Sequence, residues 1–89
     1  MRLHAIISGR VQGVFFRVNT RNKANELGLS GWVKNRWDGK VEVICEGSKE
    51  MLEIMLKWLK KGPKYAFVEK VDYRIEEKDK EFGNFEILY

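Results

Sequence analysis

The chain has 89 residues, of which 44% are hydrophobic and 34% charged, and its formal net charge is +4. This length allows one domain with one core, and the composition argues against a disordered chain. The single cysteine, Cys45, excludes an internal disulfide and a zinc site built on several thiolates. We expect one cytoplasmic domain over residues 1–89, because the chain shows no signal peptide and no run of ~20 apolar residues. The positive charge favours an anionic partner: nucleic acid, an acidic membrane face or a phosphorylated metabolite.

The first third of the chain predicts a strand, a loop and a helix. Residues 3–8 are β-branched and aliphatic and end at a glycine, which is typical of a strand. A loop containing Gly13 follows. From about residue 16 to residue 27 the sequence favours a helix, and Gly28 with Leu29 after it predicts a glycine C-cap.

The middle of the chain predicts a β-hairpin. Residues 29–35 and residues 40–46 read as two strands. Asp38-Gly39 between them is a strong turn signal, because glycine accepts the positive φ that tight turns demand.

The last part predicts a second helix and two more strands. The helix begins after Ser48, a favourable N-cap, and ends at Lys60-Lys61-Gly62-Pro63. Residues 68–77 alternate as a strand does, residues 79–83 form a charged turn, and residues 85–88 predict a short final strand.

The element order is β-α-β-β-α-β with an extra terminal strand. This order predicts an α+β fold, the ferredoxin-like split βαβ sandwich, with an antiparallel sheet and two helices on one of its faces. The first two strands are joined through a helix and should run the same way, with the third strand between them. The loop after Gly9 and the end of the second strand near Asn35 should therefore meet at one edge of the sheet.

The segment from Gly9 to Arg17 joins a strand to the start of a helix. Its two glycines let consecutive backbone N–H groups face one concavity, and the helix dipole behind them favours an anion. Arg17 falls in the first helical turn, where its fork of donors suits a phosphate. The segment lacks the Lys-Ser/Thr pair of a nucleotide P-loop and the third glycine of a dinucleotide fingerprint. Taken alone, it fits either a phosphate site or a plain connection.

Two motifs together give the segment a more specific interpretation. Gly9-Arg10-Val11-Gln12-Gly13-Val14-Phe15-Phe16-Arg17 resembles one acylphosphatase signature, and Gly31-Trp32-Val33-Lys34-Asn35-Arg36-Trp37-Asp38-Gly39-Lys40-Val41-Glu42 resembles the other. Their spacing, the chain length and the element order also resemble the small stand-alone members of the acylphosphatase family, along essentially the whole chain.

The resemblance implies an enzyme that hydrolyses acyl phosphates to a carboxylate and inorganic phosphate. It implies that Arg17 binds the substrate phosphate, that Asn35 orients the attacking water, and that Thr20 supports the arginine or the loop. It also implies that the backbone N–H groups of Val11, Gln12, Gly13, Val14, Phe15 and Phe16 hold the phosphate oxygens.

The reactivity of an acyl phosphate suits these roles. The anhydride has a good leaving group, so holding the phosphate and placing water in line supply most of the acceleration. Asn35 does not titrate near neutral pH, so we expect a phosphate oxygen to take the proton of the water. We expect no covalent intermediate, no metal and no cofactor, inorganic phosphate as product and inhibitor, and a monomer.

Three positions have open or ordinary interpretations. The family often has threonine after the asparagine, where this chain has Arg36; its side chain either adds positive charge at the pocket mouth or points to solvent. Trp37 either packs on the hairpin or forms an apolar lip for the acyl group. Cys45 is expected to be a core residue, because no sequence feature lowers its pKa.

Other functions of the same fold fit less well. An RNA-recognition module carries stacking aromatics on its central strands, and residues 40–46 contain none. A metallochaperone needs a Cys-x-x-Cys loop, which this chain lacks because it has a single cysteine. A phosphate sensor that has lost turnover does not explain why both Arg17 and Asn35 are present. We therefore expect neither nucleic acid nor a membrane as partner.

Overall fold

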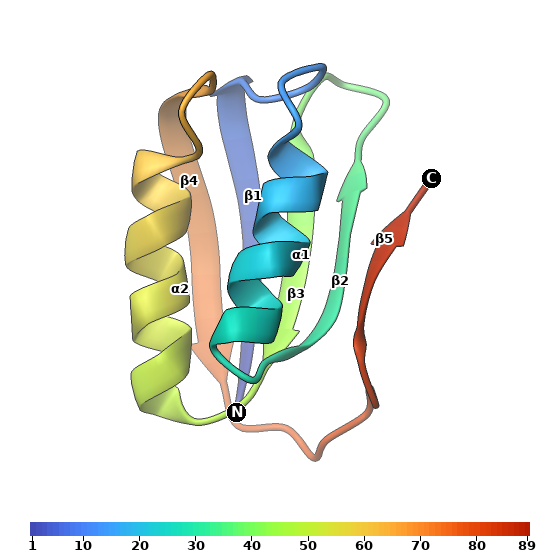
Figure 1. Ribbon diagram of the computed structural model, residues 1–89. Helices are drawn as coiled ribbons and strands as arrows, with labels where there is room; N and C mark the ends of the chain where they lie inside the picture. Colours follow the sequence, from blue (N-terminus) through green and yellow to red (C-terminus); the bar gives the residue numbers. More distant parts are fainter.

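The computed structural model describes residues 1–89 and shows two helices packed on one face of a five-stranded sheet (Figure 1). The elements in chain order are β1 (Arg2–Arg10), α1 (Phe16–Glu26), β2 (Ser30–Asn35), β3 (Val41–Glu46), α2 (Lys49–Lys61), β4 (Phe67–Glu76) and β5 (Phe85–Leu88). The predicted elements are all present, with ends that differ by one or two residues. The predicted ferredoxin-like α+β fold is confirmed.

The strand order in the sheet is β4-β1-β3-β2-β5. Strand β3 is antiparallel to both β1 and β2, so β1 and β2 run in the same direction with β3 between them, as predicted. The loop after β1 and the end of β2 therefore lie at the same end of the sheet (Figure 1).

The final strand makes the sheet mixed instead of purely antiparallel, which corrects the sequence-based expectation. Strand β5 pairs with β2 in parallel, from Gly31 opposite Phe85 to Lys34 opposite Leu88. The reason lies in the direction of β4, which is antiparallel to β1 and finishes at the end of the sheet where β2 begins. The chain crosses that end of the sheet and enters β5 alongside β2.

The core lies between the helices and the sheet. Leu52, Met55 and Leu59 of α2 are fully buried, as the apolar spacing of that helix requires. Helix α2 also has the predicted ends. Ser48 Oγ accepts a hydrogen bond from the N–H of Met51, and Gly62 follows the last turn with φ 76°.

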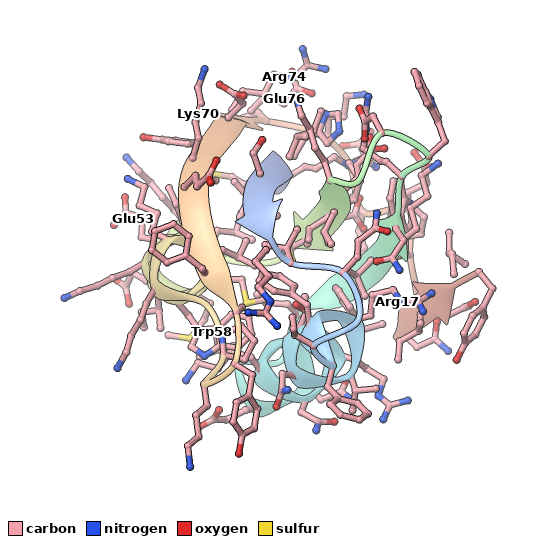
Figure 2. The ribbon with its side chains drawn as sticks, turned by 90° about the horizontal axis from the view of Figure 1, so that it is seen from above. Arg17, Glu53, Trp58, Lys70, Arg74 and Glu76 are labelled. Atoms are coloured by element: carbon pink, nitrogen blue, oxygen red, sulfur yellow. The ribbon has the colours of Figure 1, made fainter.

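On the other face of the sheet, strand β4 carries charged side chains. Figure 2 shows Lys70, Arg74 and Glu76 of the edge strand β4 pointing away from the helices. Charged side chains on an edge strand disfavour pairing with another chain. No helix of the structure is long and apolar enough to cross a membrane.

A buried ion pair holds the connection between β4 and β5. Arg2 Nη2 lies 2.7 Å from Glu46 Oε2, and both side chains are almost fully buried. The same carboxylate accepts hydrogen bonds from the backbone N–H groups of Glu81 and Phe82. Glu46 therefore fixes the segment that leads into β5.

Candidate active site

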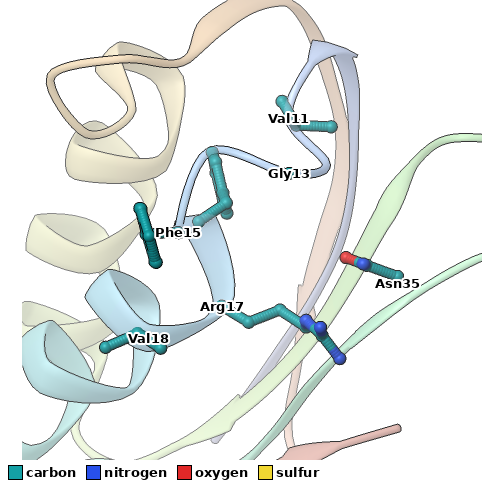
Figure 3. A pocket seen from close by; sticks show the side chains of 7 residues that line it. Val11, Gly13, Phe15, Arg17, Val18 and Asn35 are labelled. Carbon is teal, nitrogen blue, oxygen red and sulfur yellow. The ribbon is translucent and has the colours of Figure 1, made fainter.

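A pocket of about 240 Å³ opens where the loop after β1, the first turn of α1 and the end of β2 meet. We call residues 11–15 the pocket loop. The pocket is lined by Val11, Gly13, Phe15, Phe16, Arg17, Val18 and Asn35 (Figure 3). Arg17 and Asn35 come from different elements, and the fold brings them to the same pocket.

Arg17 is held by the C-terminal end of the chain. Helix α1 begins at Phe16, so Arg17 lies in its first turn, where no acidic residue is present. Its Nη1 donates to the carbonyl oxygen of Leu88 at 3.0 Å, and its guanidinium carbon lies 4.8 Å from the centre of the Tyr89 ring. Figure 2 shows the side chain reaching from α1 toward β5. No other protein acceptor takes a hydrogen bond from this guanidinium, so its remaining donors are available to an anion.

Asn35 is the last residue of β2 and pairs with Val41 in the β2–β3 ladder. Its backbone is thus fixed by the sheet. Its side chain makes no hydrogen bond within the protein, and Figure 3 shows it pointing toward the same space as Arg17. An amide in this state offers both a donor and an acceptor to a bound molecule.

The pocket loop has a backbone that suits an anion. Gly13 and Phe15 both have left-handed conformations, with φ of 74° and 60°. The N–H groups from Val11 to Phe16 donate to no carbonyl or side chain of the protein. Free N–H groups at a helix N-terminus form a concavity with partial positive charge, which favours a negatively charged ligand.

Two residues of the pocket loop do not line the pocket with the others. The Gln12 side chain instead donates to the carbonyl oxygens of Arg36 and Lys40, at 2.8 and 2.9 Å. Val14 packs against the hydrophobic core. The predicted role of these two residues concerns only their backbone N–H groups.

Thr20 holds the start of α1 and not the arginine. Its hydroxyl is fully buried and donates to the carbonyl oxygen of Phe16 at 2.8 Å. It makes no hydrogen bond to Arg17. Any support that Thr20 gives to the pocket therefore acts through the first helical turn.

The structure also shows where the side chains of Arg36 and Trp37, whose interpretation the sequence left open, are placed. The Arg36 guanidinium pairs with Asp38 at 3.0 Å and lies 3.7 Å from Glu42, so it does not face the pocket. The hydrogen bond from Arg36 holds the pKa of Asp38 below its usual value. Trp37 is 95% exposed and does not line the pocket, so it neither packs on the hairpin nor forms a lip.

The donor set of the pocket contains no group for nucleophilic or metal chemistry. None of its lining residues carries a carboxylate, an imidazole, a hydroxyl or a thiol. Cys45 is a core residue, as predicted, and burial raises the pKa of its thiol to about 12. The chain has no group of three or more His, Cys, Asp or Glu residues that could hold a metal ion.

Sequence reasoning did not find the contribution of the C-terminal residues to the site. Leu88 acts through its backbone carbonyl, which no side-chain pattern can reveal. Tyr89 is an aromatic residue at the end of a short strand, and only the parallel pairing of β5 with β2 brings it to Arg17.

A family model and curated relatives both match this chain to the same protein family. The Acylphosphatase family model matches residues 3–87. The acylphosphatase of Roseiflexus sp. (strain RS-1) is 48% identical to this chain, over 99% of the chain and 95% of the relative.

Two solved structures are also similar along nearly the whole chain. The crystal structure of acylphosphatase from Bacillus subtilis has a TM-score of 0.94 and 34% identity, and the match covers 99% of this chain and 98% of that one. An acylphosphatase from Coxiella burnetii has a TM-score of 0.91 and 40% identity, with 98% and 90% covered. The chain therefore belongs to the acylphosphatase family and is a hydrolase that acts on acyl phosphates.

Proposed function

We propose that the enzyme cleaves its substrate in one step, by attack of a water molecule on the phosphorus atom. The water oxygen forms a bond to phosphorus while the bond from phosphorus to the acyl oxygen breaks. The carboxylate leaves with the bonding electron pair, and a phosphate oxygen takes the proton of the water. The products are a carboxylate and inorganic phosphate, and no atom becomes bonded to the protein.

Arg17 and the pocket loop are assigned to the phosphate. The free donors of Arg17 and the unpaired N–H groups of residues 11–16 present positive charge on two sides of the same pocket. These groups are in place before the substrate arrives, so they stabilise the charge of the transition state without reorganising.

Asn35 is assigned to the water. Its backbone is fixed by the pairing of β2 with β3, and its side chain makes no hydrogen bond within the protein. An amide can accept a hydrogen bond from the water and donate to its oxygen or to a phosphate oxygen, which orients the water without removing its proton. The observation that carries the proposal is the convergence on one pocket of a guanidinium with unused donors and an amide that makes no hydrogen bond within the protein.

The absence of a nucleophilic side chain on the pocket wall supports direct attack by water. For the same reason we propose that the reaction needs no metal ion from the protein. Inorganic phosphate should occupy the phosphate position and inhibit the enzyme. We also propose that the active species is a monomer and that it is located in the cytoplasm.

The test is hydrolysis of benzoyl phosphate by the wild type, Arg17→Ala and Asn35→Ala, with and without a chelator. Arg17→Ala should lower turnover by about 10²–10³-fold and weaken inhibition by phosphate. Asn35→Ala should lower turnover by about 10²-fold or more and leave phosphate inhibition close to that of the wild type. The chelator should change neither turnover nor phosphate inhibition in any of the three proteins.

Arg36→Ala is the matched control, because it removes an arginine near the site whose guanidinium faces Asp38 and Glu42 instead of the pocket. This variant should retain phosphate inhibition. Equal loss of turnover and of phosphate inhibition in the Arg17 and Asn35 variants would contradict the division of roles. Sedimentation of the active enzyme as a dimer would contradict the monomer.

A further inference from the structure

The pocket has an apolar end that the proposed chemistry does not use. Phe15 and Val18 both line the pocket, and their side chains are 73% and 39% exposed. Phe15 is the N-cap of α1 and Val18 lies in the first turn of the same helix, so both come from the segment that carries Arg17. Figure 3 shows Val18 and Arg17 leaving the first turn of α1 in opposite directions. The pocket therefore has a charged end and an apolar end.

The backbone of Phe15 adds a second observation. Its φ of 60° is a left-handed conformation that glycine and asparagine adopt readily and that a bulky residue rarely adopts. Its exposed ring is not held there by the core. An aromatic residue in an unfavourable conformation and without a packing role is characteristic of a binding site.

The direction of the reaction assigns the apolar end to the acyl group. In phosphoryl transfer the attacking and leaving oxygens lie roughly in line on opposite sides of the phosphorus. If Asn35 holds the water at one end of the pocket, the leaving carboxylate lies toward the other end. Phe15 and Val18 are at that end.

We propose that Phe15 and Val18 form the binding site for the acyl group, and that the enzyme prefers substrates with an aromatic or branched apolar acyl group. This inference rests on the proposed function, because it takes the positions of phosphate and water from it. Contact with the Phe15 ring and the Val18 methyl groups removes apolar surface of such an acyl group from water. A small acyl group gains little from this contact.

The experiment compares kcat/KM for benzoyl phosphate and acetyl phosphate. Phe15→Asn removes the ring and keeps a residue that tolerates the left-handed backbone. In this variant kcat/KM for benzoyl phosphate should fall about tenfold more than kcat/KM for acetyl phosphate, the ratio expected when apolar contact with one ring is lost. Val18→Ser should shift the ratio in the same direction by about threefold.

Tyr65→Asn is the matched control, because it removes an exposed aromatic residue that does not line the pocket. It should leave the ratio of the two substrates unchanged. An unchanged ratio in both Phe15→Asn and Val18→Ser, in enzyme that still hydrolyses acyl phosphates, would overturn the acyl site and leave the proposed function intact. If Arg17→Ala and Asn35→Ala instead hydrolyse acyl phosphates as fast as the wild type, the proposed function is refuted, and the acyl site with it.

Discussion

The Nε2 atom of Gln12 lies 2.8 Å from the carbonyl oxygen of Arg36 and thereby ties the pocket loop to the hairpin that carries Asn35. A second hydrogen bond from the same atom reaches the carbonyl oxygen of Lys40 at 2.9 Å. One side chain thus connects the two segments that supply the proposed phosphate-binding N–H groups and the proposed water-positioning amide.

Replacing Gln12 by methionine should loosen this connection. The variant keeps the volume of the side chain but removes one of the two hydrogen bonds that each carbonyl accepts, because the N–H groups of Gly39 and Arg36 still donate to the carbonyl oxygens of Arg36 and Lys40. Loss of the two Gln12 hydrogen bonds should cost about 1–2 kcal/mol of stability. Turnover should fall about tenfold, because small errors in position are costly for an oriented reaction. Urea unfolding and benzoyl phosphate kinetics measure the two effects. Full turnover in a destabilised variant would show that the link serves stability alone.

Replacing Tyr89 by alanine should weaken the hold on Arg17. The Tyr89 ring contacts one face of the guanidinium, and such a cation–π contact at an exposed site is worth about 0.5–1 kcal/mol. We expect the KM for benzoyl phosphate and the inhibition constant of phosphate to rise together by about two- to fivefold. An increase in one constant without the other would mean that Tyr89 does not act through the phosphate position.

The carboxylate of Glu46 should make stability depend on pH in the acid range. Burial opposes its ionisation, but hydrogen bonds from Arg2 and from the N–H groups of Glu81 and Phe82 outweigh burial and hold the pKa of Glu46 below its usual value. A lowered pKa in the folded state stabilises the fold above the unfolded pKa of about 4.3. This contribution is lost as the pH falls through the folded pKa.

Glu46→Gln should therefore lower the free energy of unfolding by about 1–3 kcal/mol at neutral pH, and by much less near pH 3. Urea unfolding at the two pH values measures the difference. Glu53→Gln is a suitable control, because Glu53 is exposed on α2 and has no ion-pair partner (Figure 2). An equal loss at both pH values in Glu46→Gln would show that the charge of the carboxylate is not what matters.

Gly31 should not tolerate a side chain. A Cβ atom at this position would lie 1.9 Å from the carbonyl oxygen of Ile44 in the neighbouring strand, and the φ of Gly31 is 138°. We expect Gly31→Ala to destabilise the protein by more than about 3 kcal/mol, as measured by thermal or urea unfolding. Gly83→Ala places its Cβ in open space and should change stability by less than about 0.5 kcal/mol. Similar unfolding midpoints for the two variants would contradict this account.

The local signals in the sequence predicted most of the fold. The Asp38-Gly39 turn, the Ser48 cap and the stop at Gly62 all mark features that depend on a few neighbouring residues, and all three are present. The meeting of the pocket loop with Asn35 was also predictable, because a helix crossover followed by a hairpin leaves few ways to order three strands.

Long-range contacts were not predictable in the same way. The parallel pairing of β5 depends on where β4 ends, and the Arg36 pairs depend on which hairpin carboxylates come within reach. Gln12 was identified only as part of a motif. Its side chain contacts two backbone carbonyls, which every residue type has, so the sequence could not predict these partners. Short-range patterns thus predicted the elements, and the structure was needed for the contacts that hold Arg17 and Asn35 in place.

Strands β4 and β5 lie at opposite edges of the sheet, so the chain must traverse the whole end of the domain before Leu88 can reach Arg17. Contacts between residues so distant in sequence carry a high entropic cost and tend to form late in folding. Helical signal should therefore return earlier than catalysis when the denatured enzyme refolds. The guanidinium would acquire its working orientation only once the last strand had docked.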